Sequence, residues 1–201
     1  MMEQAKQLTK AQLSSLKKSA EAAHENDAPY KRDSNIQFVL YLIMVLAIAL
    51  SIRLFITEPV RVDGDSMWPT LKNNERLFVE KVSLWFEPPK RGEIVICYYP
   101  GYTASCVKRV IGLPGDTVSI TNGILYVNGE ELDESEYWDD RGNIALDMGE
   151  TVIPENSVFV VGDNRNYSRD SRAWGVGSIP YERVAARAHY VIWPLNARRS
   201  V

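Results

Sequence analysis

Cysteine and histidine are scarce in this 201-residue chain, which has two of each and contains no C-x-x-C pair and no histidine cluster. Such pairs and clusters are the usual ligand sets of protein-bound zinc, so we expect neither a metal nor any other cofactor. A surplus of positive charge is also missing, because the formal net charge is −3 and the basic residues are scattered. A nucleic-acid-binding surface needs clustered basic residues, and we therefore expect no nucleic-acid partner.

Long apolar runs are equally rare, and only residues 36–56 form one of membrane length. Its uninterrupted centre covers residues 38–50 and is short for a membrane span. With the apolar residues that follow, and with the Arg53 side chain extending its charge toward the far interface, the run reaches about 20 residues, which is enough to cross a bilayer. The alternative is a buried helix of a soluble protein. We predict one transmembrane helix over residues 36–56.

Basic residues beside this run set its expected orientation in the lipid bilayer. Lys31 and Arg32 flank its N-terminal side, and positively charged flanks tend to stay in the cytoplasm. Two arginines beyond the centre of the run act against this preference. We predict that residues 1–35 are a polar cytoplasmic tail, without a cleavable secretory signal, and that residues 57–201 form an extracytoplasmic domain.

The region after the apolar run has no helical half and no internal repeat. Its short apolar or alternating segments are separated by glycine, proline and asparagine turns, a pattern typical of β-strands. Tight turns and an acidic stretch at residues 130–150 mark residues 117–157 as a small inserted β-ribbon. We therefore predict an all-β domain over residues 57–201.

The sequence GDSMWPTL at residues 64–71 places Ser66 in a turn between Gly64 and Pro69. Glycine permits a tight turn, and proline stops a helix from running through it. Most serines in such loops only bond to nearby backbone, so this motif is weak by itself. A serine becomes a nucleophile when a neighbouring base removes its proton.

Lys108 is the candidate for that base, because it lies in a mostly apolar, strand-like run over residues 107–113. A lysine acts as a base only when it is neutral, and burial lowers its pKa from about 10.4 by up to roughly 3–5 units. His24 precedes the apolar run, and His189 lies in a late apolar strand where a core position is expected. The residues therefore predict a Ser/Lys hydrolase.

Three motifs in register extend this interpretation. They are GDSMWPTL at residues 64–71, KRVIGLPGD at residues 108–116 and GDNRNYSRDSRAWG at residues 162–175. Their order and spacing after a membrane span resemble the Gram-positive pattern of the bacterial type I signal peptidases, peptidase family S26, over roughly residues 36–195. The resemblance implies signal peptidase-like β-sheets and a membrane-anchored serine endopeptidase that removes N-terminal signal peptides from exported preproteins. It makes Ser66 the nucleophile and Lys108 the general base.

The same resemblance assigns supporting roles around this pair. Ser168 matches the family's serine hydroxyl that bonds the lysine amine and orients it, while Asp170 and Arg172 match residues that brace the site. The backbone N–H of Ser66 would donate to the oxyanion. Some family members carry a serine side-chain donor two residues before the nucleophile, where this chain has Gly64. The second donor therefore stays open, and a backbone N–H near Gly64 is one candidate.

The implied substrate is an extended preprotein segment with small residues at its cleavage positions. It would add as a strand to sheet edges near residues 60–64 and 105–107, with shallow pockets for small side chains. The candidate substrate contacts are Val62, Met67, Cys106 and Val107.

Cys97 and Cys106 flank a predicted hairpin. Because side chains alternate between the two faces of a strand, Cys106 should face the same way as Lys108 and lie close to the substrate groove. The two cysteines either form a disulfide across the hairpin or remain free thiols, because hairpin register cannot be read to one residue from a sequence.

Two other classes of protein share part of this pattern. A LexA-like self-cleaving regulator has a Ser/Lys pair in a β-rich fold, but it carries a DNA-binding helix-turn-helix where residues 1–57 offer an anchor. A non-catalytic, membrane-tethered binding protein would be expected to have lost Ser66 or Lys108, and both stand in intact motifs. Cleavage of exported preproteins is therefore the predicted function, with preproteins and the lipid bilayer as partners.

Overall fold

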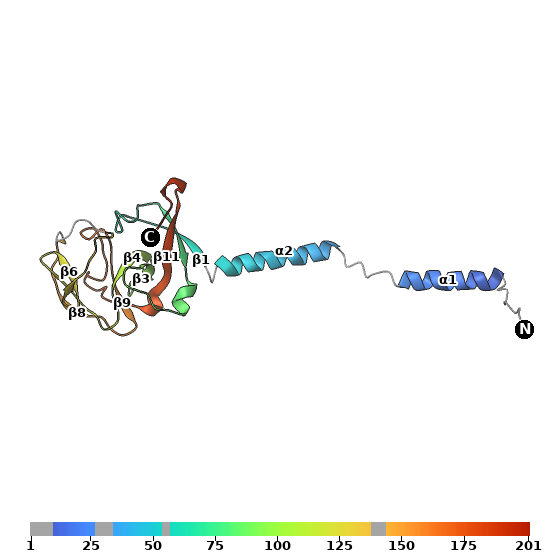
Figure 1. The fold of residues 1–201 in the computed structure, drawn as a ribbon, viewed down its shortest axis with the longest axis horizontal. Coiled ribbons are helices and arrows are strands. Elements are labelled where there is room, and N and C mark those ends of the chain that lie inside the picture. Colours follow the sequence, from blue (N-terminus) through green and yellow to red (C-terminus); the bar gives the residue numbers. More distant parts are fainter. Residues whose placement is uncertain (1–9, 27–33, 54–56, 138–143) are drawn as a thin grey trace, which may run out of the picture. The chain divides into compact units, whose positions relative to one another are not determined.

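The chain forms two compact units, Met1–Ala49 and Leu50–Val201. The first unit holds α1 (Lys10–Asn26) and nearly all of α2 (Ser34–Ser51), which Figure 1 draws in blue and cyan. The second unit holds all of the strands. The computed structural model describes residues 10–26, 34–53, 57–137 and 144–201.

The helix α2 covers most of the membrane span predicted over residues 36–56, and residues 54–56 lie outside the described residues. Nearly every position from Phe38 to Leu50 is apolar, so α2 has no polar face. Its large apolar side chains are exposed. Within the described stretches, no helix combines the length and the apolar character that a membrane crossing requires.

Antiparallel β-strands dominate the second unit, which confirms the mostly β architecture predicted from its short apolar segments. The larger sheet has eight strands in the order β1-β2-β11-β3-β4-β9-β10, with β12 paired to β11. All of its paired strands run antiparallel. They are β1 (Thr57–Arg61), β2 (Arg76–Glu80), β3 (Ile94–Tyr98), β4 (Ser105–Gly112), β9 (Ser157–Val161), β10 (Ile179–Pro180), β11 (Val184–Trp193) and β12 (Arg199–Ser200).

A smaller sheet of four strands, in the order β7-β6-β5-β8, falls within residues 117–157, where the sequence predicts an inserted ribbon. The turn residues Asn128 and Gly129 both have positive φ, which a type I′ hairpin turn requires. Its strands are β5 (Thr117–Thr121), β6 (Ile124–Val127), β7 (Glu130–Glu131) and β8 (Met148–Val152). Short 3₁₀ helices also occur in this unit, namely η2 (Val82–Trp85), η3 (Tyr181–Arg183) and η4 (Leu195–Ala197).

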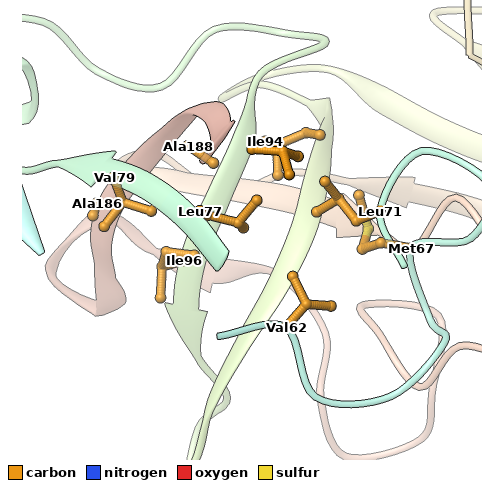
Figure 2. Close-up of a cluster of buried hydrophobic side chains, with 10 residues drawn as sticks. Val62, Met67, Leu71, Leu77, Val79, Ile94, Ile96, Ala186 and Ala188 are labelled. Carbon is orange, nitrogen blue, oxygen red and sulfur yellow. The ribbon is translucent and has the colours of Figure 1, made fainter. Parts of the chain in front are cut away.

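The loop that carries Ser66 is fixed to the core of the larger sheet by its own apolar residues. Met67 and Leu71 are fully buried and pack in one cluster with Leu77 and Ile94, as Figure 2 shows. Burial of each such side chain contributes about 1.5–3 kcal/mol. The Leu71 N–H also donates to the Met67 carbonyl at 2.8 Å. The core therefore holds the residues after the serine, while Ser66 itself stays half-buried.

Candidate active site

Ser66 and Lys108 come from distant parts of the chain and meet in direct contact. Ser66 lies in the loop between β1 and β2, and Lys108 lies in β4, which β11 and β3 separate from β2 in the sheet. Lys108 Nζ donates to Ser66 Oγ at 2.6 Å and to the Val107 carbonyl at 2.9 Å. The structure thus brings together the two residues that the sequence pairs as nucleophile and base.

The Lys108 side chain is buried, with 3% of its surface exposed. Burial disfavours the charged ammonium and lowers the pKa of Lys108 below its ordinary value. Negative charge on Cys106, Asp170, Cys97 and Asp163, in that order, acts in the opposite direction, but desolvation dominates. Within the described residues Nζ donates only to a hydroxyl and a carbonyl, so no carboxylate holds its proton.

The segment after β9 holds the serine loop through hydrogen bonds and close packing. The Asn164 N–H donates to the Ser66 carbonyl at 3.1 Å, and the Asn164 side-chain amide donates to the Asp65 carbonyl at 2.9 Å. A Cβ atom on Gly162 would lie 2.4 Å from the Ser66 carbonyl oxygen and 2.2 Å from Ser168 Oγ. Any side chain at this position would displace the serine loop. Sequence reasoning assigned no role to Gly162 or Asn164, although both lie in the third motif.

Asp170 and Arg172 form a buried ion pair beside this segment. Arg172 Nε and Nη2 donate to the two Asp170 carboxylate oxygens at 2.8 and 2.7 Å, and Asp170 Oδ2 also accepts from the Gly162 N–H at 3.0 Å. Burial alone would raise the pKa of Asp170, but the hydrogen bonds and charge of Arg172, together with the Gly162 N–H, outweigh it and lower that pKa. The pair therefore fixes the backbone at Gly162, which in turn packs on the Ser66 carbonyl.

A second buried ion pair connects the residue after the lysine to the residue after Gly162. Arg109 Nε and Nη2 donate to the Asp163 carboxylate at 2.9 and 2.7 Å, and Arg109 Nη1 donates to the Gly92 carbonyl at 2.7 Å. The Tyr137 ring stacks on the Arg109 guanidinium, 3.9 Å from Cζ to the ring centre. This pair links β4 to the segment that holds the serine loop, and sequence reasoning did not identify it.

Replacing Asp163 with alanine should lower the free energy of unfolding by about 3–5 kcal/mol, because it leaves the Arg109 charge buried without its partner. Asp163 is fully buried and Arg109 is 6% exposed. Chemical denaturation of the variant and of the unchanged protein measures this difference. The matched control is Asp147→Ala, an exposed position where we expect a change within about 0.5 kcal/mol. Equal losses in the two variants would contradict a structural role for the Arg109–Asp163 pair.

Ser168 lies beside the site without the bond expected of it. Its hydroxyl is buried and has no hydrogen-bond partner among the described residues, so the predicted bond to the Lys108 amine is absent. The Lys108 amine instead donates to Ser66 Oγ and to the Val107 carbonyl. The Ser168 hydroxyl is close enough to the Asp170 carboxylate to contribute to its lowered pKa. Ser168 packs against Gly162, and this position places its hydroxyl near the Asp170 carboxylate.

The backbone around Gly64 decides which N–H groups are available to an oxyanion. Gly64 has φ of +91°, a conformation that glycine adopts without strain. Its N–H donates to Asn73 Oδ1 at 3.2 Å, so this group already has an acceptor. The Ser66 N–H has none within the described ranges. Ser66 therefore supplies one free donor, and the N–H of Gly64 is not a second.

The candidate substrate contacts divide into two pairs. The Val62 and Met67 side chains are 3% and 1% exposed and belong to the core cluster of Figure 2, so they offer no surface to a substrate. The prediction that Val62 and Met67 contact the substrate would then depend on their backbone groups. Cys106 and Val107 are half-buried and remain accessible in β4.

Comparison with known proteins finds similarity over the part of the chain that holds these residues. Residues 35–193 match the family model described as "Signal peptidase, peptidase S26". A "Signal peptidase I" of Bacillus licheniformis is 40% identical over 182 residues, which cover 87% of this chain and 97% of that protein. The "Signal peptidase I S" of Bacillus subtilis (strain 168) is 38% identical over 177 residues, covering 84% and 95%. The crystal structure of a signal peptidase I from Enterococcus faecalis V583 aligns with a TM-score of 0.42 and 30% identity, over 50% of this chain and 97% of that one.

Proposed function

Because this chain belongs to the peptidase S26 family of signal peptidases, it is a serine endopeptidase that removes signal peptides, and we propose that Ser66 and Lys108 carry out the cleavage. The observation that supports this assignment is the 2.6 Å contact between Ser66 Oγ and the buried Lys108 Nζ. A hydroxyl and a desolvated amine at hydrogen-bond distance are the two groups that a Ser/Lys hydrolase needs.

The proposed reaction first forms an acyl-enzyme on Ser66 and then hydrolyses it. Neutral Lys108 takes the proton of Ser66 as the hydroxyl attacks the scissile carbonyl, and the resulting ammonium protonates the leaving amine. The neutral amine then removes a proton from the water that hydrolyses the acyl-enzyme, and it returns this proton to Ser66 Oγ as the serine leaves. During both steps the free N–H of Ser66 donates to the oxyanion. The buried Arg109–Asp163 and Asp170–Arg172 ion pairs keep these atoms in place while charge develops.

The proposed substrate path follows β4, because part of this strand is unpaired on one side. The register of β4 with β9 begins at the pair Arg109–Val161, so residues 105–107 have no strand partner on that side among the described residues. An extended peptide that adds there would hydrogen-bond to free backbone groups and pass in front of Lys108. Cys106 and Val107, both half-buried, would contact its small side chains.

Incubating the purified protein with an exported preprotein tests this function. Cleavage should occur after small residues at the end of the signal peptide, and mass spectrometry of the released fragment identifies the position. The control substrate carries a bulky residue at the cleavage position and should resist cleavage. Self-cleavage without processing of the preprotein would point instead to the regulator class.

The proposed location of the protein is a cell membrane, with residues 36–56 as a single span, residues 1–35 in the cytoplasm and residues 57–201 outside. The continuous apolar surface of α2 supports this placement. The apolar part of a signal peptide stays in the bilayer, so an anchored protease meets the cleavage site where the chain emerges. Aromatic side chains are enriched at membrane interfaces, and three exposed ones on the second unit are Trp68, Trp85 and Phe86.

Removing residues 1–56 should leave a domain that folds and still cleaves preproteins, because β1 and the rest of the sheet remain. We expect its kcat/KM to be lower than that of the full chain when both are assayed with lipid vesicles, because the truncated domain no longer concentrates at the bilayer. Protease added outside intact spheroplasts should degrade residues 57–201 and spare residues 1–35. Protection of the C-terminal part from external protease would contradict the proposed orientation.

A further inference from the structure

Cys97 and Cys106 face each other directly across the β3–β4 hairpin. They are partners in its antiparallel register, and their Sγ atoms lie 3.3 Å apart as free thiols. Directly opposed residues of an antiparallel pair have Cα atoms about 4.5–5.5 Å apart, which is within the range that a disulfide spans. A disulfide would therefore require only that the two sulfur atoms approach each other. The strands themselves already have the required spacing.

The two thiols differ in reactivity because their surroundings differ. Cys97 is fully buried, while Cys106 is half-buried and can meet an external reagent. The hydrogen bond from the Cys97 thiol, with smaller contributions from the Tyr99 hydroxyl and the Lys108 charge, outweighs burial and lowers the pKa of Cys106 to about 7. The same bond to Cys106, together with burial, raises the pKa of Cys97. Cys106 is therefore the attacking thiol of the pair and Cys97 the one that resolves the mixed disulfide.

This pair lies beside the proposed catalytic base. Cys106 is two residues from Lys108 in β4, so the two side chains leave the strand on the same face. Among the charged groups around Lys108, Cys106 acts most strongly to keep the amine protonated, ahead of Asp170, Cys97 and Asp163. A thiolate at Cys106 thus opposes the neutral state that the base requires.

We propose that Cys97 and Cys106 form a redox site that controls the peptidase: the dithiol places an ionisable sulfur next to Lys108, and the disulfide removes that charge. This rests on the proposed role of Lys108 as the base. In the disulfide state the Lys108 amine loses a negative neighbour and is neutral in a larger fraction of molecules. Oxidation therefore activates the enzyme wherever protonation of Lys108 limits the rate.

The oxidant is a small-molecule or protein disulfide, and the exchange balances without any other reactant. The Cys106 thiolate attacks one sulfur of the external disulfide, forms a mixed disulfide and releases the first thiolate. Cys97 then attacks Cys106 Sγ, its proton passes to the departing sulfur, and the second thiol is released. The two cysteines lose two electrons and two protons in total, and the external disulfide is reduced to two thiols.

The first measurement detects the disulfide without reference to activity. The full-length protein in detergent micelles is treated with oxidised glutathione or with dithiothreitol, and free thiols are then blocked by alkylation. Trypsin releases residues 92–108 as one peptide that carries both cysteines, because no lysine or arginine lies between its ends. We expect this peptide to lose two hydrogen atoms after oxidation and to be alkylated twice after reduction. A peptide that stays doubly alkylated, or that carries glutathione alone, would overturn the proposal.

The second measurement links the disulfide to catalysis. At a pH above the Cys106 pKa of about 7, and within the range where kcat/KM still falls with acidity, we expect the oxidised protein to have a kcat/KM about threefold higher than the reduced protein, as for the loss of one nearby charge at the edge of a partly solvated site. The Cys97→Ala/Cys106→Ala double variant, whatever its own kcat/KM, should not respond to oxidant. Equal kcat/KM in a preparation shown to contain the disulfide would overturn the control of activity.

Failure of the catalytic assignment gives a different result. If Ser66→Ala or Lys108→Ala retained full activity, the proposed dyad would be wrong, while the mass of the 92–108 peptide would still report whether the disulfide forms. If both variants were inactive and oxidation changed neither the peptide nor the rate, the dyad would stand and the redox site would not.

Discussion

Replacing Lys108 with alanine should lower kcat/KM on a preprotein by a factor of about 10⁴ or more. The lysine is the group in contact with the Ser66 hydroxyl, at 2.6 Å, and the described residues place no other base there. Ser66→Ala should be equally inactive, because it removes the nucleophile. The double variant should be no worse than either single one, because two residues that act as one unit are lost together with the first of them.

Conservative replacements separate chemistry from packing. Lys108→Met keeps most of the buried side-chain volume and removes the amine, so it should fold well and be inactive. Lys108→Arg should also be inactive, because a guanidinium does not release its proton near neutral pH. The matched control is Lys90→Ala, at an exposed lysine whose side chain pairs with exposed Glu87, where activity should remain. Thermal unfolding of each variant shows whether the fold is intact, and an active Lys108→Ala would refute the dyad.

The sequence was sufficient to pair Ser66 with Lys108 because an apolar strand lysine and three motifs in register add to a serine turn that is a weak signal by itself. Ser66 sits in a turn that Gly64 and the following apolar residues fix, and Lys108 sits in an apolar strand. Burial of a strand lysine follows from the apolar residues around it, and burial is what lowers its pKa. The strand pattern likewise predicted the mostly β fold, but the register that pairs Cys97 with Cys106 comes from the structure, because hairpin register cannot be read to one residue from a sequence.

The contacts around the dyad were not predictable, because they join loops that are far apart in the chain. The Asn164 amide bonds to the Asp65 carbonyl across 99 positions, and the motif that contains Asn164 gives no indication of that partner. Side-chain direction was the other obstacle. The Ser168 hydroxyl turns toward Gly162, and the Met67 side chain turns into the core. Each choice depends on the space that the finished fold leaves, which residue types alone do not specify.

The pH dependence of cleavage should show the second large effect. If Lys108 must be neutral in the free enzyme, kcat/KM falls tenfold for each pH unit below the pKa of this lysine. Burial lowers that pKa, so the fall should begin well below the reference value of about 10.4. Assays of the fully reduced protein between about pH 5 and 10 with one preprotein locate the inflection. An inflection at or above the reference value would mean that the lysine is not desolvated in the working enzyme.

Two variants of the same experiment decide which group causes the acid limb. His189 bonds to the Glu80 carboxylate at 3.3 Å on β11 and makes no contact with Ser66 among the described residues, so His189→Ala should leave the limb in place. A limb near about pH 6.5 that disappears in His189→Ala would identify a histidine base and exclude the Ser/Lys mechanism. In Cys106→Ala the limb should instead move to lower pH, because the sulfur that keeps the lysine protonated is gone. If the acid limb moves to lower pH in Cys106→Ala and does not change in His189→Ala, the group that titrates is Lys108.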